Sequence, residues 1–206
     1  MTKPRVEPRQ QRSRDTYERI LTVAADIFTE LGYAGTTTNK VAESAGISIG
    51  TLYHYFPDKD ALLYALAERH LDRGAAHIES VFQGLRETQP GLEDSLRTVI
   101  KAIVRMHVDE FNLHHLLWDS APRSVALQRR MYELDQAIAA EVLWHLDLAG
   151  VARENSALIA DLLVAGVERQ VHRATIDPIL HGDPRADPEV LIEVLTQLWK
   201  CALEGS

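Results

Sequence analysis

The side chains in this sequence that are best suited to chemistry follow one another between residues 48 and 55. They are small, polar or aromatic, and few are needed for packing: Ser48, Ile49, Gly50, Thr51, Tyr53, His54 and Tyr55. Small residues let a helix approach the edges of DNA bases, and hydroxyl and ring N–H groups can hydrogen-bond to bases or phosphates. This stretch is therefore a candidate DNA-contacting surface. The alternative is a surface helix of an ordinary bundle, whose aromatic rings cover a core.

Two short helices joined by a tight turn are predicted to position these side chains. A threonine among residues 36–38 can cap the first helix, because its hydroxyl can accept a hydrogen bond from a free N–H group. Gly46 tolerates the positive φ that is common where a helix stops. Ser48 can cap the second helix, and Pro57 ends it, since the residue before a proline avoids the α region. This is the sequence pattern of a helix-turn-helix, whose second helix enters the major groove.

The charge of the chain is unevenly distributed. A net charge of −8 argues against a simple nucleic-acid binder, which is often basic overall. The first fourteen residues, however, contain five basic residues and one acidic residue, a local balance of +4. This basic arm can contact phosphates or the minor groove, and we count Arg12 and Arg14 among the candidate DNA contacts. The alternative is a disordered, solubilising tail.

The rest of the sequence predicts an all-α protein. Apolar residues at helical spacing indicate helices over residues 12–31, 60–83, 92–120, 124–148 and 155–174, and a last helix that begins at Pro188 with Asp187 as its cap. Gly32 is the stop signal of the first helix. No segment alternates apolar and polar residues as a half-buried strand does. We expect an N-terminal arm and helix-turn-helix domain over residues 1–58 and a larger helical domain over residues 59–206.

The composition favours a cytoplasmic protein. No apolar run approaches the 18 residues of a membrane-spanning helix, and the N-terminus lacks the apolar segment of a signal peptide. The single cysteine, Cys201, excludes an internal disulfide, and we expect it on a buried helix face.

The order of these features resembles the TetR (tetracycline-repressor) family of transcription regulators. The resemblance covers about residues 12–64 and rests on the segments AADIFTELGYAGTTT and NKVAESAGISIGTLYHYFPDKDALL. It implies a homodimer that places two recognition helices on a palindromic operator, and an effector pocket in the second domain whose occupation usually releases DNA. By position it implies that bases face Ser48, Ile49, Gly50, Thr51 and His54, and that phosphates meet Thr37, Thr38, Tyr53, Tyr55 and Lys59.

The resemblance also suggests how the two chains meet. In the family the last two helices form a four-helix bundle with their counterparts, and here these helices are more apolar than a surface helix needs. The predicted interface residues are Leu162, Val167, Leu195, Leu198 and Trp199. The alternative is that both helices pack within the monomer.

A candidate effector pocket lies in the second domain. One helix face mixes apolar bulk with ring N–H groups, and neighbouring helices add polar anchors, as small-molecule sites do. The candidate residues are Met106, His107, Phe111, His114, Trp118, Trp144, Arg169 and His172. The alternative is that the aromatic residues are core and the histidines are at the surface. His107, Glu110 and His114 have metal-ligand spacing, but zinc needs ligands from more than one segment, so we expect no metal.

We found no catalytic motif, such as a phosphate-binding loop or a nucleophile elbow, and expect neither enzyme activity nor a cofactor. The sequence predicts a dimeric, sequence-specific DNA-binding regulator, with a repressor released from its operator by a small-molecule effector as the favoured form. One alternative is an architectural or division-type regulator without an effector. Another is an all-α ligand-binding or interaction protein that does not bind DNA.

Overall fold

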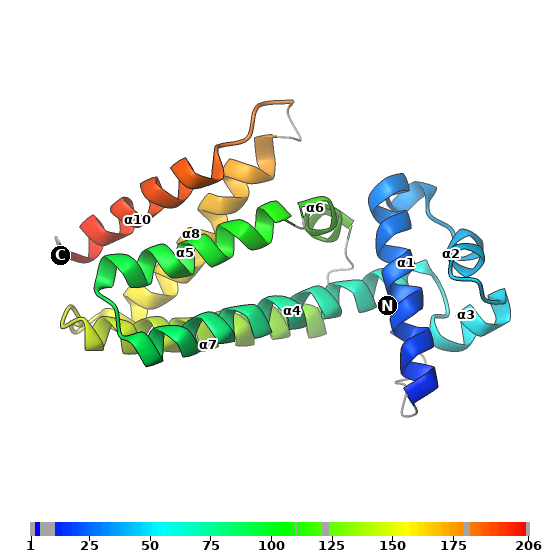
Figure 1. Ribbon diagram of the computed structural model, residues 1–206, viewed down its shortest axis with the longest axis horizontal. Coiled ribbons are helices and arrows are strands. Elements are labelled where there is room, and N and C mark those ends of the chain that lie inside the picture. Colours follow the sequence, from blue (N-terminus) through cyan, green and yellow to red (C-terminus); the bar gives the residue numbers. More distant parts are fainter. Residues whose placement is uncertain (1–2, 5–10, 110, 121–123, 179–181, 205–206) are drawn as a thin grey trace. The chain divides into compact units, whose positions relative to one another are not determined.

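The computed structural model describes residues 3–4, 11–109, 111–120, 124–178 and 182–204, with only the backbone described at 118–120. These residues form helices and no strand, which confirms the predicted all-α class (Figure 1). The helices are α1 (Gln11–Gly35), α2 (Thr38–Ser44), α3 (Ile49–Tyr55), α4 (Lys59–Thr88), α5 (Leu92–Asp109), α6 (Phe111–Ser120), α7 (Val125–Leu148), α8 (Ser156–Thr175) and α10 (Pro188–Glu204).

The chain divides into two compact units. The N-terminal unit comprises Met1–Asp72 and Asn112–Gln128, and the C-terminal unit comprises Arg73–Phe111 and Arg129–Ser206. The division falls inside α4 and not at residue 58, because the first turns of α4 bury Leu62, Leu63 and Leu66 in the core of the N-terminal unit.

The core of the N-terminal unit gathers the apolar faces of α1, α2 and α3. Ile20, Leu21, Ala24 and Phe28 of α1 are buried against Val41, Leu52 and Phe56, and Ile47 packs on them while partly buried. Leu116 and Leu117 of α6 join the same core. These residues of the first three helices and the turn between them therefore form one core.

Local signals set the helix ends near the recognition helices. Gly32 has φ +66° and leaves the helical region inside α1, so its predicted role as a stop is correct. The buried Thr36 then donates a hydrogen bond to the Gly32 carbonyl oxygen at 2.7 Å, which fixes the turn into α2.

At the other end of the chain, the Asp187 carboxylate accepts hydrogen bonds from the N–H groups of Glu189 and Val190 at 2.8 and 3.2 Å. The predicted start of the last helix is confirmed.

Two expectations about the C-terminal part of the chain were wrong. Residues 92–120 form two helices, α5 and α6, and not one; the absence of Gly and Pro permits a continuous helix but does not require it. Residue 110, between them, lies outside the described residues. Cys201 is exposed and not buried, because α10 turns its Leu195 and Leu203 side inward and Cys201 lies off that face.

In the C-terminal unit α5 packs along α10 and also contacts α8. Ile100 and Val104 of α5 share a core with Val167 and Val171 of α8. α8 and α10 approach closely at Gly166, where a Cβ atom would lie 2.6 Å from the Trp199 ring. A glycine is needed here because any side chain would displace the indole.

Candidate nucleic-acid interface and effector site

The turn between α2 and α3 is built by the predicted capping residues. The Thr37 hydroxyl accepts a hydrogen bond from the Lys40 N–H at 3.3 Å and begins α2. The Ser48 hydroxyl accepts one from the Thr51 N–H at 3.0 Å and begins α3. Gly46, between the helices, has φ +64°, a conformation that favours glycine. The predicted helix-turn-helix geometry is therefore present.

One face of α3 is open and carries most of the predicted base contacts. Ile49, Gly50, Tyr53 and His54 are exposed, whereas Leu52 on the opposite face is fully buried. At Gly50 a Cβ atom would meet only the Ser48 hydroxyl, at 3.8 Å, so nothing covers the backbone there. A helix with such a face can approach base edges closely.

Hydroxyl groups beside this face are joined across the two helices. The Tyr53 hydroxyl of α3 lies 3.1 Å from the Thr38 hydroxyl of α2, and Thr37 next to it is exposed. Thr51 is half-buried, and its hydroxyl lies 2.8 Å from that of Ser48. Hydroxyl groups of this kind are common partners of phosphate oxygens.

Two predicted phosphate contacts are instead engaged within the N-terminal unit. Tyr55 is only 7% exposed, and its hydroxyl lies 2.9 Å from that of Ser13 in α1. The Lys59 ammonium donates a hydrogen bond to the Tyr33 carbonyl oxygen at 3.0 Å and lies 4.0 Å from the centre of the Tyr33 ring. Both side chains hold helices together, a role that the sequence did not predict.

The basic arm is described only in part. Arg12 and Arg14, in the first turn of α1, are exposed, whereas Arg5 and Arg9 lie outside the described residues. Because Ser13 bonds to Tyr55, this basic turn lies beside the C-terminal end of α3. Arg12 and Arg14 are therefore on the same unit as the open face of α3 and close to its end.

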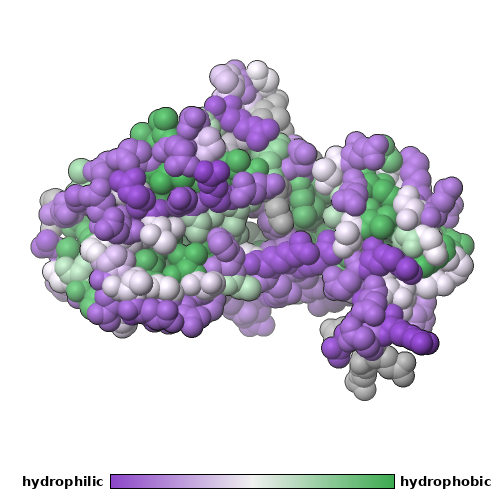
Figure 2. All heavy atoms as spheres, viewed as in Figure 1, coloured by the Kyte–Doolittle hydropathy of each residue, from purple (hydrophilic) through white to green (hydrophobic). Residues whose placement is uncertain are grey.

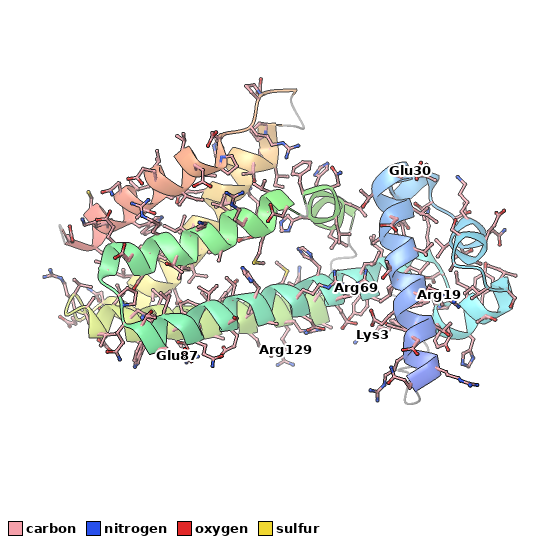
Figure 3. The ribbon with its side chains drawn as sticks, in the orientation of Figure 1. Lys3, Arg19, Glu30, Arg69, Glu87 and Arg129 are labelled. Atoms are coloured by element: carbon pink, nitrogen blue, oxygen red, sulfur yellow. The ribbon has the colours of Figure 1, made fainter. Side chains whose placement is uncertain are left out.

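Sequence reasoning missed two contacts that fix α4 to the helices before it. The Tyr33 hydroxyl donates a hydrogen bond to the Asp60 carboxylate, and this bond raises the pKa of Tyr33 to about 12. Arg69 extends from α4 to α1, where it donates to the Leu21 carbonyl oxygen at 3.3 Å and pairs with Glu18 at 3.5 Å (Figure 3). No sequence signal indicates these partners, because they are 27 and 51 residues apart.

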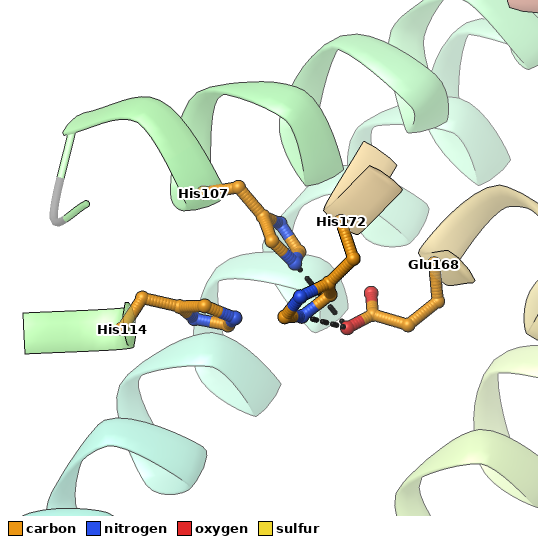
Figure 4. A group of neighbouring side chains, drawn as sticks. All are labelled: His107, His114, Glu168 and His172. Carbon is orange, nitrogen blue, oxygen red and sulfur yellow. Dashed lines mark hydrogen bonds and ion pairs between the residues drawn. The ribbon is translucent and has the colours of Figure 1, made fainter. Parts of the chain in front are cut away.

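In the C-terminal unit two predicted pocket residues, His107 and His172, contact Glu168, which was not among the predicted residues. The Nε2 atoms of His107 in α5 and His172 in α8 lie 3.2 and 3.4 Å from the same carboxylate oxygen of Glu168 (Figure 4). The side chains of His107 and His172 are 3% and 1% exposed, and that of Glu168 is 44% exposed. The rings lie edge to face, with centres 4.8 Å apart.

The charges of this cluster are strongly coupled. Burial alone would lower the pKa of His107, but the hydrogen bond and charge of Glu168 raise it above its ordinary value. Burial would raise the pKa of Glu168, yet the hydrogen bonds from both histidines hold it well below its usual range. Desolvation and then the charge of Glu168 raise the pKa of Asp135 in α7. The Glu168 carboxylate is therefore ionised and is stabilised by the two imidazole rings.

The other predicted pocket residues of the C-terminal unit have different surroundings. Met106 is half-buried, and Phe111 is buried under the guanidinium of Arg185, 4.0 Å from its ring centre. Trp144 is exposed, and Arg169, also exposed, pairs with Asp177 at 3.5 Å.

The other two belong to α6. His114 lies in the N-terminal unit, with its Nδ1 atom 3.0 Å from Nε2 of His70. The side chain of Trp118 lies outside the described residues.

A cavity of about 30 Å³ lies in the C-terminal unit, between α4, α5, α7 and α8. Its walls include Phe82, Ile100, Val142 and His145, and none of the predicted pocket residues. A ligand of drug size needs roughly 300 Å³ or more, whereas this cavity has room for about one water molecule.

The five predicted dimer residues differ in burial. Leu162 and Leu198 are 56% and 50% exposed, so their apolar surface is available to a partner. Val167 and Leu195 are 1% and 3% exposed and belong to the core of this chain, which leaves almost no surface for an interface. Trp199 packs over Gly166, and its indole N–H donates to the Gln170 side chain at 3.0 Å.

Further exposed apolar residues extend the outer surfaces of these two helices. Leu158 precedes Leu162 on α8, and Val190 and Val194 precede Leu198 on α10, each at a spacing of four residues. We refer to the exposed apolar side chains on these two helices as the apolar strip: Leu158, Leu162, Val190, Val194 and Leu198. On the face shown in Figure 2, apolar side chains reach the surface at α10. Exposed apolar patches of this kind mark interaction surfaces.

Comparisons with known proteins agree with the geometry of α1 to α4. Residues 20–66 match the model of the family described as "Bacterial regulatory proteins, tetR family". The HTH-type transcriptional regulator UidR of Escherichia coli (strain K12) is 34% identical over 76 residues, which are 37% of this chain and 39% of UidR. An HTH-type transcriptional regulator of Staphylococcus aureus (strain USA300) is 33% identical over 69 residues, 34% of this chain and 37% of that protein. The matched part thus spans about two fifths of the length of these relatives.

Solved structures share the fold over nearly the whole chain. A TetR-family protein from Mesorhizobium loti MAFF303099 has a TM-score of 0.74 at 21% identity, covering 95% of this chain and 98% of that one. The fatty acid degradation regulator FadR from Bacillus halodurans has a TM-score of 0.66 at 18% identity, covering 94% and 96%. Within the described residues, no helix combines the length and the hydropathy needed to cross a bilayer.

Proposed function

Because this chain belongs to the TetR family of bacterial regulatory proteins, we propose that it regulates transcription by binding an operator as a homodimer. The observation that carries the proposal is the open face of α3, where Ile49, Gly50, Tyr53 and His54 are exposed and take no part in the core. Aromatic and apolar side chains that stay exposed on a short, capped helix indicate that this helix binds a partner. The major groove of DNA accepts such a helix.

The contacts divide by chemistry. Ser48, Ile49, Gly50, Thr51 and His54 face bases in this proposal, with Ile49 offering apolar contact such as a thymine methyl group. Thr37, Thr38 and Tyr53 contact phosphates through their hydroxyl groups, and Arg12 and Arg14 add the positive charge that a phosphate backbone attracts. Tyr55 and Lys59 act indirectly, because they hold α3 and α4 in place.

The homodimer is proposed to form through the apolar strip on α8 and α10. The strip leaves five large apolar side chains half-exposed or more in one chain. A second copy of the same strip would remove them from water, and each buried side chain contributes in proportion to its area. A two-fold symmetric dimer presents two α3 helices, so its operator is a palindrome with half-sites about one helical turn apart.

We favour a cytoplasmic repressor that an effector releases from DNA. The C-terminal unit would bind the effector, and binding would favour one of two spacings of the recognition helices. A regulator that works without a small-molecule effector is the second candidate. It is consistent with a cavity of about 30 Å³ among the described residues of the C-terminal unit, which is too small for an organic ligand.

Selection from random duplex DNA tests the proposed function. Full-length protein is used to enrich binding sequences, and the affinity of the enriched duplex is measured at two salt concentrations. We expect a palindromic motif and an affinity that falls steeply with salt, because phosphate contacts release counterions. If no motif emerges and binding at low salt is also absent, the chain is a helical ligand-binding or interaction protein and the proposal fails.

A further inference from the structure

The C-terminal unit contains a set of metal-ligating atoms that the proposed DNA contacts do not use. Two imidazole nitrogens and a carboxylate oxygen converge from α5 and α8, at His107, Glu168 and His172 (Figure 4). Two histidines and one carboxylate, supplied by two separate helices, form a common ligand set for transition metals.

The spacing of these atoms fits a single metal ion. With metal–nitrogen and metal–oxygen distances near 2.0–2.2 Å, neighbouring ligand atoms of a tetrahedral ion lie about 3.3 Å apart. The Glu168 oxygen lies 3.2 Å from Nε2 of His107 and 3.4 Å from Nε2 of His172. Both separations between the carboxylate and an imidazole thus match the ligand spacing of a tetrahedral ion, and the candidate ligand atoms all lie within 4.8 Å of one another.

The orientation of the rings also fits. Nδ1 of His107 lies 2.8 Å from the Ile103 carbonyl oxygen, so this nitrogen carries the proton and donates the bond. Nε2 then faces Glu168, and such a second contact is what fixes a ligating imidazole in proteins. Glu168 and His172 are four residues apart on α8, which places them on one face of the helix.

The site can be reached from solvent, and carboxylates lie in and near it. The rings of His107 and His172 are almost fully buried, whereas the half-exposed Glu168 side chain gives an ion a route from solvent. Nearby Asp135 on α7 adds a further carboxylate to the field of Glu168. An imidazole must be deprotonated at the ligating nitrogen, so metal ions and protons compete for the same position.

We propose that His107, Glu168 and His172 bind a divalent transition-metal ion, with Zn²⁺ as the best match to this ligand set and spacing. Three protein ligands leave a coordination position open for water or another small ligand. The site does not depend on the DNA-binding function, because all three residues lie in the C-terminal unit and DNA contacts are proposed only for the N-terminal unit.

Metal titration of the full chain without DNA tests this proposal. Protein stripped with a chelator is titrated with Zn²⁺ by calorimetry, and with Co²⁺ to record the visible absorption that reports coordination geometry. We expect one ion per chain and a Co²⁺ spectrum typical of a four- or five-coordinate site with nitrogen and oxygen ligands. Zn²⁺ should also raise the melting temperature, since it binds the folded chain.

Matched variants locate the site. Glu168→Gln and His107→Gln each remove a ligand, whereas Glu154→Gln and His77→Gln make the same changes at exposed positions outside the cluster. We expect the first pair to weaken Zn²⁺ binding at least about tenfold, the lower end of what even an outer-shell partner contributes, and the second pair to leave it unchanged. Circular dichroism of the metal-free variants checks that each one folds. If His107→Gln does not fold, the Zn²⁺ affinity of Glu168→Gln decides the test.

Two results would overturn the proposal. One is the absence of Zn²⁺ binding by the wild-type chain, in which case hydrogen bonds alone hold the cluster. The other is binding of equal strength in Glu168→Gln and in the wild type, which would place the ion at other histidines. Neither result bears on operator binding, which is measured separately on metal-free protein.

Discussion

The Tyr55 hydroxyl lies 2.9 Å from the Ser13 hydroxyl and joins the end of the recognition helix α3 to the first turn of α1. Tyr55 also packs its ring edge to face against Tyr17, with centres 6.1 Å apart. The orientation of α3 therefore depends on α1, and the basic turn at Arg12 and Arg14 is held near the same end of α3. This contact explains how a helix of two turns keeps a fixed position.

The Ser13–Tyr55 hydrogen bond should be measurable by a double-mutant cycle. Tyr55→Phe keeps the ring and removes the hydroxyl, and we expect it to lower the free energy of unfolding by about 1 kcal/mol. Ser13→Ala should cost a similar amount, and the double variant little more than either single variant, because both lose the same bond. Urea unfolding provides the three values, and strictly additive losses would argue against the contact.

Arg12 and Lys59 should differ in their effect on DNA binding. Arg12 is exposed, so Arg12→Ala should reduce the dependence of affinity on salt by about one unit of slope. The Lys59 ammonium bonds to Tyr33, so Lys59→Ala should lower stability and leave the slope nearly unchanged. Affinities at several salt concentrations separate the two cases. If Lys59→Ala also reduced the dependence of affinity on salt, Lys59 would be a phosphate contact.

Gly50→Ala should separate stability from recognition. The new Cβ atom has room in the free protein, and alanine favours the helix by up to about 1 kcal/mol over glycine. The same methyl group would stand between the α3 backbone and the base edges, so affinity for the selected operator should fall. Melting and operator titration of one protein preparation provide both values. Unchanged affinity would mean that the helix does not approach the bases at Gly50.

His145 should make the C-terminal unit less stable in acid. Its ring is buried and stacks on Phe82, with centres 5.7 Å apart. Burial lowers the pKa of His145, the charge of Arg86 lowers it further, and the charge of Glu141 opposes both.

A pKa depressed in the folded chain gives stability that is present above the unfolded value of 6.5 and is lost as the pH falls through the folded value. Between pH 7.5 and 5 the wild type should therefore lose more unfolding free energy than His145→Gln. The comparison removes the contributions of the other histidines, which both proteins share. Equal losses in the two proteins would show that His145 does not titrate differently on folding.

The apolar strip should control the oligomeric state. Leu198→Glu places a charge at the C-terminal end of the strip on α10, and we expect it to produce a folded monomer. Leu148→Glu is the control, because Leu148 is a similarly exposed leucine at the end of α7. Sedimentation velocity distinguishes the two species. A dimer that persists in Leu198→Glu, at an unchanged dissociation constant, would place the interface elsewhere.

Local patterns made the recognition helices predictable, and distant partners did not. Ser48, Gly46 and Asp187 act through neighbours within a few residues, so their types alone indicated the helix ends. Glu168 lies 61 residues from His107, and nothing in the sequence pairs them. The sequence suggested Glu110 as the carboxylate of a possible metal group, because only spacing within one helix can be read from a single chain.

Burial was also harder to predict than helix formation. Val167 and Leu198 are both apolar residues of the last helices, yet one is core and the other is half-exposed. Helical spacing identifies an apolar face, but a helix with apolar residues on two faces does not reveal which one the chain itself covers. The same ambiguity explains why Cys201 was expected in the core and lies at the surface.

The ratio of affinities for the selected operator and for a scrambled duplex of equal length tests the central proposal most directly. Both duplexes present the same phosphate charge, so the ratio reports base recognition and not electrostatic attraction. We expect the selected duplex to bind on the order of 1,000-fold more tightly or better at physiological salt. A ratio near one would contradict sequence-specific recognition by α3.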